Sequence, residues 1–272
     1  MKHLRNAYLF LVFGILYIPI LTLILFSFNE SNSTAVFTGF SFKWYVELFN
    51  SPETFTALRN TLILAVSSSL IATVIGTAAA EGIYKMRSKL MKGAVTSVTN
   101  IPMMNPDIVT GMSMMLFFVA VAAILGVSYE NVGFTAMLIS HTTFCLPYVI
   151  LSVLPRINEL GDSLSEAALD LGCTPLKAFF KVKVPNIMPG VLSGAVMAFT
   201  MSLDDFVISY FVGSSNFQTL PLLIYSMTKK KVTPDMYALS TLIVVTVFVL
   251  LIVSNLRSGK KLDEERKRGK TK

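Results

Sequence analysis

The chain has 272 residues, of which 53% are hydrophobic and only 14% are charged. A water-soluble domain carries about 25% charged residues, so this composition excludes an ordinary soluble fold and predicts a membrane protein. The net charge of +7 does not indicate a nucleic-acid-binding protein, because the basic residues cluster in short segments beside apolar runs.

A helix that spans a bilayer needs about 20 mainly apolar residues, and six runs of the chain meet this requirement. They cover residues 7–28, 59–84, 94–127, 132–153, 188–212 and 236–256. The first run is longer than the core of a signal peptide, which has about 7–15 apolar residues, so we predict that it stays as the first membrane helix. The prediction is an all-α membrane protein with six transmembrane helices, in which residues 1–272 form one transmembrane domain.

The distribution of Lys and Arg predicts the orientation, because these residues accumulate in cytoplasmic loops. Most of the 23 lie near the N-terminus, in the loop 85–92, in the loop 155–187 and in the basic tail 257–272. Both termini are therefore predicted to be cytoplasmic, and the tail is expected to contact anionic lipid. The three lysines at 229–231 fall on the opposite side and are the one local exception.

The segment 161–189 is the least membrane-like stretch between two of the predicted membrane helices. Ser163 precedes Glu166 by three positions, which is the spacing of a capping box at the start of a helix. An apolar stripe at helical spacing follows, formed by Leu164, Ala167, Ala168 and Leu171. Gly172 comes next, where a left-handed residue is predicted to end this short helix.

A second short helix is predicted directly after this turn. Thr174 is a suitable cap, and Pro175 suits the first helical position. Pro185 is predicted to end the helix, because proline lacks the backbone N–H. Such a helical pair fits either of two roles, a helix that docks in a groove of another protein or an amphipathic hairpin on the membrane surface. The residues alone leave both open.

The same segment resembles the EAA loop of the permeases of ABC importers. Glu166, Ala167 and Ala168 are followed three residues later by Gly172, and Val182 and the pair Val184-Pro185 stand where the family pattern has Ile and Leu-Pro. The resemblance implies that this cytoplasmic loop, about 155–187, docks in a groove of an ATPase subunit. The coupling residues that it implies are Glu166, Ala167, Ala168, Asp170, Gly172 and Pro185.

Ionisable residues inside predicted membrane helices are costly and indicate functional sites. Those in the predicted helices are Asp107, Asp204, Asp205 and His141, and no Lys or Arg lies at comparable depth. A net negative path of this kind favours a cationic substrate. We therefore predict that these four residues line a translocation path.

Structural roles compete with this interpretation. Asp107 follows Pro106 and could cap a break in the helix. Asp204 and Asp205 are adjacent, so their side chains point about 100° apart on a helix and cannot both face one point. His141 suits a hydrogen bond between helices as well as a ligand site.

Further stretches resemble the spermidine/putrescine permease family of ABC importers, most closely its C-type permease subunit. They are MMNPDIVTGMSMM, SHTTFCLPYVILSVLPRI, FTMSLDDFVISYFV and TLPLLIYSMTKKKVTPDMYALSTL. The resemblance implies the type I ABC importer permease fold, polyamine transport and a location in the bacterial plasma (inner) membrane. It also implies three kinds of partner: a homologous second permease subunit, two copies of an ABC ATPase and an extracytoplasmic polyamine-binding protein.

The chain itself is predicted to bind no cofactor and to catalyse no reaction. It has no Walker A motif, so ATP and Mg are expected in the partner ATPase, and Cys145 and Cys173 do not have the spacing of a metal site. Two alternatives remain. One is an ABC permease of the same fold for another small solute, and the other is a stand-alone secondary transporter, which would have no use for a docking loop.

Overall fold

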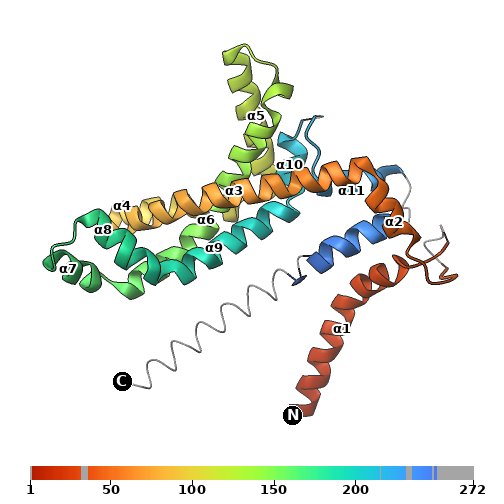
Figure 1. Cartoon of the computed structure of the whole chain (residues 1–272), viewed down its shortest axis with the longest axis horizontal. Coiled ribbons are helices and arrows are strands. Elements are labelled where there is room, and N and C mark those ends of the chain that lie inside the picture. Colours follow the sequence, from red (N-terminus) through yellow and green to blue (C-terminus); the bar gives the residue numbers. More distant parts are fainter. Residues whose placement is uncertain (1, 32–35, 215, 231–234, 247, 250–272) are drawn as a thin grey trace. The chain divides into compact units, whose positions relative to one another are not determined.

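The computed structural model describes residues 2–31, 36–214, 216–230, 235–246 and 248–249, and the described chain is dominated by helices (Figure 1). The basic tail 257–272 and part of the predicted sixth helix lie outside these residues. The elements group into two compact units, one of Met1–Leu58 with Leu220–Lys272 and the other of Arg59–Thr219. The prediction of one transmembrane domain over the whole chain stays a prediction.

The unit Arg59–Thr219 contains most of the long helices. They are α3 (Pro52–Lys85, whose start belongs to the other unit), α4 (Lys89–Met104), α5 (Asp107–Leu125), α6 (Tyr129–Leu160) and α9 (Val184–Asp204). Shorter elements join them: α7 (Ser163–Asp170), α8 (Pro175–Ala178) and the π-helix η1 (Phe179–Lys183) lie between α6 and α9, and α10 (Val207–Val212) follows α9. The pair α7 and α8 lies at one end of α6 and α9, and α10 lies at the other (Figure 1).

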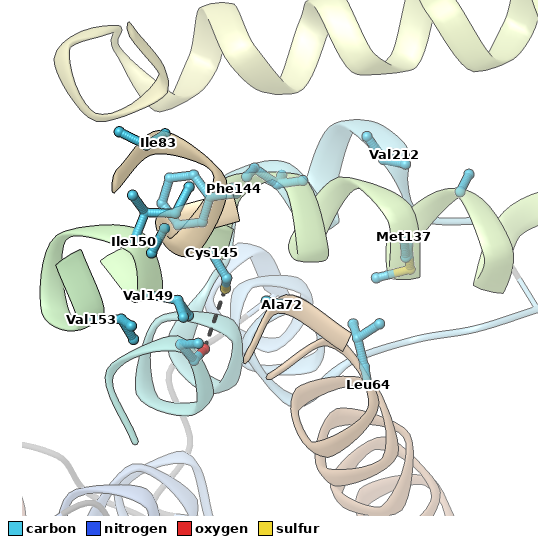
Figure 2. Packing of buried hydrophobic residues seen from close by; sticks show 14 of the residues in the cluster. Leu64, Ala72, Ile83, Met137, Phe144, Cys145, Val149, Ile150, Val153 and Val212 are labelled. Carbon is cyan, nitrogen blue, oxygen red and sulfur yellow. Dashed lines mark hydrogen bonds between the residues drawn. The ribbon is translucent and has the colours of Figure 1, made fainter. Parts of the chain in front are cut away.

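The most extensive helix contact in this unit joins α6 to α9, and small residues make it close. A Cβ added to Gly190 would lie 2.8 Å from the carbonyl oxygen of Ser152, and one added to Gly194 would lie 3.1 Å from Cα of Val149. Close backbone approach through small residues is typical of helices that pack inside membranes. Cys145 of α6 adds a hydrogen bond from Sγ to the Ala198 carbonyl of α9 at 3.3 Å (Figure 2).

Buried apolar side chains of α3, α5, α6, α9 and α10 form the core of this unit. Figure 2 shows the part of the cluster in which α3 residues such as Leu64 and Ala72 lie near α6 residues such as Met137 and Val149. The core is built from helix faces, as the apolar runs of the sequence predict.

The other unit contains α1 (Lys2–Phe26), α2 (Lys43–Asn50), α11 (Leu220–Lys230) and the helix Asp235–Thr246. Its apolar core is formed by Leu48, Ala57, Leu220, Leu223 and Leu239. Trp44 is buried, and its indole Nε1 donates to the carbonyl of Asn29 at 2.6 Å. This hydrogen bond fastens α2 to the chain that follows α1.

Four helices of the described residues are long and apolar enough to cross a membrane. They are Pro52–Lys85, Asp107–Leu125, Gly133–Leu160 and Pro175–Asp204. Leu11–Phe26 and Asp235–Thr246 are apolar but shorter within the described part of the chain. The prediction of a helical, multi-pass membrane protein is confirmed for the described residues. The count of six spans stays a prediction.

The predicted helix 94–127 is wrong as a continuous element, because it is broken between α4 and α5. Asn105 has an extended backbone, with φ −78° and ψ 144°. The cause is Pro106, whose ring disfavours the helical conformation of the residue before it. The new helix then begins at Asp107.

The predicted helix 188–212 also differs from the structure. It begins earlier, with α9 at Val184, and it is broken at Asp205, whose backbone is extended. The loop predicted at 155–187 is shorter than expected, because α6 continues to Leu160. Only 161–183 separates α6 from α9, and we refer to this stretch as the connecting segment.

Candidate functional site

The first helix of the connecting segment begins differently from the prediction. Asp162 occupies the capping position of α7 and makes no side-chain cap hydrogen bond, while its carbonyl accepts from the N–H of Glu166 at 2.9 Å. The predicted capping box of Ser163 and Glu166 is therefore wrong, because Ser163 is already helical. The cap therefore lies one residue earlier than predicted, directly after Gly161, which ends α6 with φ +63°.

The end of α7 is as predicted. Gly172 has φ +83°, a left-handed conformation that glycine adopts without steric cost. The N–H of Gly172 donates to the Leu169 carbonyl at 2.9 Å, and the N–H of Cys173 donates to the Ala168 carbonyl at 3.0 Å. This pair of bonds is a Schellman motif. The motif fixes the direction in which the chain leaves α7.

The start of α8 is also as predicted, whereas its end is not. The Thr174 hydroxyl accepts from the N–H of Lys177 at 3.4 Å, and Pro175 is in the first turn. Pro185 does not end the helix, because the chain continues through η1 into α9. A proline ring clashes with the carbonyl four residues earlier in an α-helix. The wider π-turn relieves this clash, and the N–H of Val184 donates to the carbonyl of Phe179, five residues before it.

Most of the predicted coupling residues lie on the surface of the connecting segment. Glu166, Ala167, Asp170 and Gly172 of this segment are exposed, whereas Ala168 is buried. Pro185 is exposed as well, but it belongs to α9. The predicted apolar stripe therefore faces outward except at Ala168. The exposed apolar side chains beside these residues are Leu164, Leu169, Leu171, Leu176 and Phe180. Large exposed apolar side chains that are concentrated in one short segment are a feature of interaction sites.

A further ion pair, which no pattern in the sequence predicts, joins η1 to α3. Nζ of Lys183 is 2.8 Å from Oε2 of Glu81 and donates to Oε1 at 2.9 Å. The side chains are 4% and 11% exposed, so the pair is largely buried. Lys183 is one of the basic residues of the predicted loop 155–187. Glu81 is the signal that could have indicated a pair, since an acid near the end of an apolar helix needs a partner.

At the opposite end of α9, Asp205 stabilises the break before α10. Its carboxylate accepts from the N–H of Ile208 at 3.3 Å and from the N–H of Ser209 at 2.9 Å. Its side chain is 7% exposed and lies 3.5 Å from Nε2 of His141. These contacts explain Asp205 by local structure, because a carboxylate satisfies the free N–H groups at the start of a helix.

His141 lies within a buried polar network that connects four helices. Its Nδ1 is 2.8 Å from the Ser202 hydroxyl of α9, and its Nε2 is 3.1 Å from the Ser209 hydroxyl of α10. Ser68 of α3 donates to Ser202 at 2.9 Å. His141 is 1% exposed, so the geometry supports the role of a hydrogen bond between helices. Its place in a translocation path stays a prediction.

Asp107 and Asp204 are the exposed members of the predicted path. Asp107 begins α5, where a negative charge is favourable because helix N-termini carry a partial positive charge. Asp204 is the last residue of α9, where the helix dipole disfavours an acid. Helix stability therefore explains Asp107 but not Asp204. Of the predicted path residues, the structure brings together Asp205 and His141.

Comparison with known proteins supplies a family for this arrangement. Residues 72–258, more than half of the chain, match the model described as "Binding-protein-dependent transport system inner membrane component". The chain is 38% identical over 257 residues to the spermidine/putrescine transport system permease protein PotC of Haemophilus influenzae, covering 94% of this chain and 97% of the relative. It is 38% identical over 239 residues to the putrescine transport system permease protein PotI of Escherichia coli, covering 88% and 85%.

Solved structures share the fold. A chain of a bacterial ABC transporter involved in the import of alginate has a TM-score of 0.76 at 17% identity, with 95% of this chain and 96% of that chain covered. A chain of the MetNI methionine ABC transporter in an inward-facing conformation has a TM-score of 0.62 at 21% identity, with 77% and 98% covered. At these identities the likeness concerns the fold alone.

Proposed function

This chain belongs to the family of binding-protein-dependent transport system inner membrane components, and on that premise we propose that it forms part of the translocation path of an ABC importer for spermidine or putrescine. It is a non-catalytic permease subunit of such an importer. The observation that carries the choice of substrate is 38% identity, over most of both chains, to permeases named for spermidine and putrescine transport.

The exposed acid Asp204 gives this substrate a physical reason. A polyamine is a flexible polycation, and a carboxylate at the end of α9 would attract it. Asp107, exposed at the start of α5, is a second candidate contact. Asp205 and His141 belong to the proposed path as the groups that hold the α9–α10 break, next to Asp204.

The connecting segment is proposed to dock on a cytoplasmic ABC ATPase, of which two copies serve the complete importer. The short helix α7 and the turn after it expose small and polar residues, and apolar side chains lie beside them. Such a helix suits a groove of another protein. The exposed residues are Glu166, Ala167, Asp170 and Gly172. ATP and Mg would be held by that ATPase. Closure of the ATPase pair would move the docked helices and bias the bundle between outward-open and inward-open states.

The remaining features of the proposal concern the membrane. The four long apolar helices and the two shorter ones are consistent with six spans in the type I arrangement, in the bacterial inner membrane with both termini cytoplasmic. A homologous second permease would complete the path. An extracytoplasmic binding protein would deliver the polyamine.

The test is uptake of labelled spermidine and putrescine by cells that carry or lack this chain, with the neighbouring transporter genes present and other polyamine systems removed. We expect energy-dependent uptake that is lost on deletion and restored by the intact chain. Uptake unchanged by deletion would refute the polyamine substrate. Uptake that persists without the ATPase gene would favour a stand-alone secondary transporter.

A further inference from the structure

The buried contact between α3 and the connecting segment involves more than one ion pair. Glu81 of α3 faces Lys183, the last residue of η1, across 102 positions of sequence. Nζ of Lys183 also lies 4.6 Å from the centre of the Tyr84 ring, a cation–π contact one helical turn further along α3. A second lysine, Lys85, approaches the same carboxylate at 3.1 Å, but its side chain is 68% exposed.

Stability alone is a weak explanation for this arrangement. Removing two charges from water costs about as much as their attraction returns, so a buried ion pair can often be replaced by apolar side chains without loss. In some proteins a buried pair fixes the relative position of two elements, because a buried charge without its partner is strongly unfavourable. Glu81 and Lys183 are placed to do this for η1 and α3, since their largely buried side chains join the two helices.

The location of Lys183 makes this position relevant to the exposed helices. Both α7 and α8 contact η1, and η1 continues directly into α9. The π-turn before Pro185 widens the helix at this point, and π-turns of this kind are frequent at functional sites. Asn186 supports the turn by donating from its side chain to the Val182 carbonyl at 2.7 Å. The position of α7 and α8 therefore depends on the position of η1.

We propose that the Glu81–Lys183 ion pair is a positioning device that holds α7 and α8 in the place where they engage an ATPase subunit and that passes their displacement to α3. The inference rests on the proposed docking of the connecting segment. Glu81 and Lys183 are positioning residues, since neither is exposed enough to meet the partner itself.

The experiment uses the intact permease pair in lipid nanodiscs and measures its apparent Kd for the purified ATPase subunit, which does not require knowledge of the substrate. The test variants are Lys183→Met and the double variant Glu81→Gln with Lys183→Met, in which no buried charge is left unpaired. Lys183→Arg keeps the charge. Lys85→Gln is the matched control, because it removes an exposed partner of the same carboxylate.

We expect the double variant to reach the membrane and to retain the second permease as the wild type does, while its Kd for the ATPase rises about tenfold, within the usual range of coupling between sites. Lys85→Gln and Lys183→Arg should stay near the wild-type Kd. Uptake per ATP hydrolysed should fall in the double variant as well.

A double variant with wild-type Kd and wild-type uptake per ATP overturns the inference. If the double variant does not reach the membrane, Lys183→Met and Lys183→Arg decide: a tenfold higher Kd for Lys183→Met beside a wild-type Kd for Lys183→Arg supports the role of the charge, and equal Kd values of these two variants refute it. A wild-type pair that binds no ATPase overturns the proposed docking together with this inference. The two failures are thus distinguishable, since the second is visible before any variant is made.

Discussion

Substitutions at Gly172 separate the conformation of the turn after α7 from the space that a docked partner needs. Gly172 has φ +83°, and a left-handed conformation costs an ordinary residue about 1–2 kcal/mol. Asn tolerates this conformation better than Ala does, because its short polar side chain can bond locally. A Cβ at this position would meet no atom of the chain within 4 Å, so the fold itself has room for a side chain.

The expected magnitudes follow from these two effects. Strain of about 1–2 kcal/mol in Gly172→Ala would lower the equilibrium ratio of docking-competent to other turn conformations by about 5–30-fold. Gly172→Asn has less strain but more bulk, and overpacking a close contact costs about 1–3 kcal/mol. Gly172→Asp adds a charge to that bulk. We expect Gly172→Asp to abolish transport, and Gly172→Asn to impair it at least as much as Gly172→Ala.

The assay is uptake of labelled spermidine at matched membrane abundance, together with the Kd of the permease pair for the ATPase. Membrane insertion should be unchanged, because the turn lies outside the core. Wild-type uptake by Gly172→Asp at equal abundance would refute the reasoning. If Gly172→Asn transports normally and Gly172→Ala does not, then only the turn conformation matters and no partner approaches this glycine closely.

Two further predictions concern the bundle. Asp204→Ala should lower polyamine uptake with little change in thermal stability. Asp205→Ala should instead lower the free energy of unfolding by about 1–2 kcal/mol, because it removes the acceptor for two N–H groups of α10. If the two variants change uptake equally and change the melting temperature of the purified complex equally, the separate roles are contradicted. Gly190→Ala should destabilise the α6–α9 contact by about 1–3 kcal/mol, since the added Cβ would lie 2.8 Å from the Ser152 carbonyl oxygen. Gly93→Ala is its control, as a Cβ there meets nothing within 4 Å, and equal melting temperatures of the two variants would show that the contact yields without cost.

The sequence by itself determined the features that depend on neighbours within about one helical turn. Gly172, Thr174 and Pro175 have the roles that their residue types predict, because left-handed turns, caps and first-turn prolines are local. Apolar runs of sufficient length predicted the membrane helices for the same reason. The local signal failed at Pro185. Proline lacks a backbone N–H and was expected to end the helix, but a π-turn directly before it lets the chain continue into α9.

Only the tertiary structure decided the pairings between distant residues. Glu81 and Lys183 are 102 positions apart, and no local pattern shows that this lysine of the polar connecting segment forms a buried ion pair with an acid of α3. In the same way, the break at Asp205 turned that side chain toward His141 and left the adjacent Asp204 exposed. Such contacts depend on how each helix is rotated and packed against the others, and this is fixed by the sum of many side-chain contacts rather than by any short stretch of sequence.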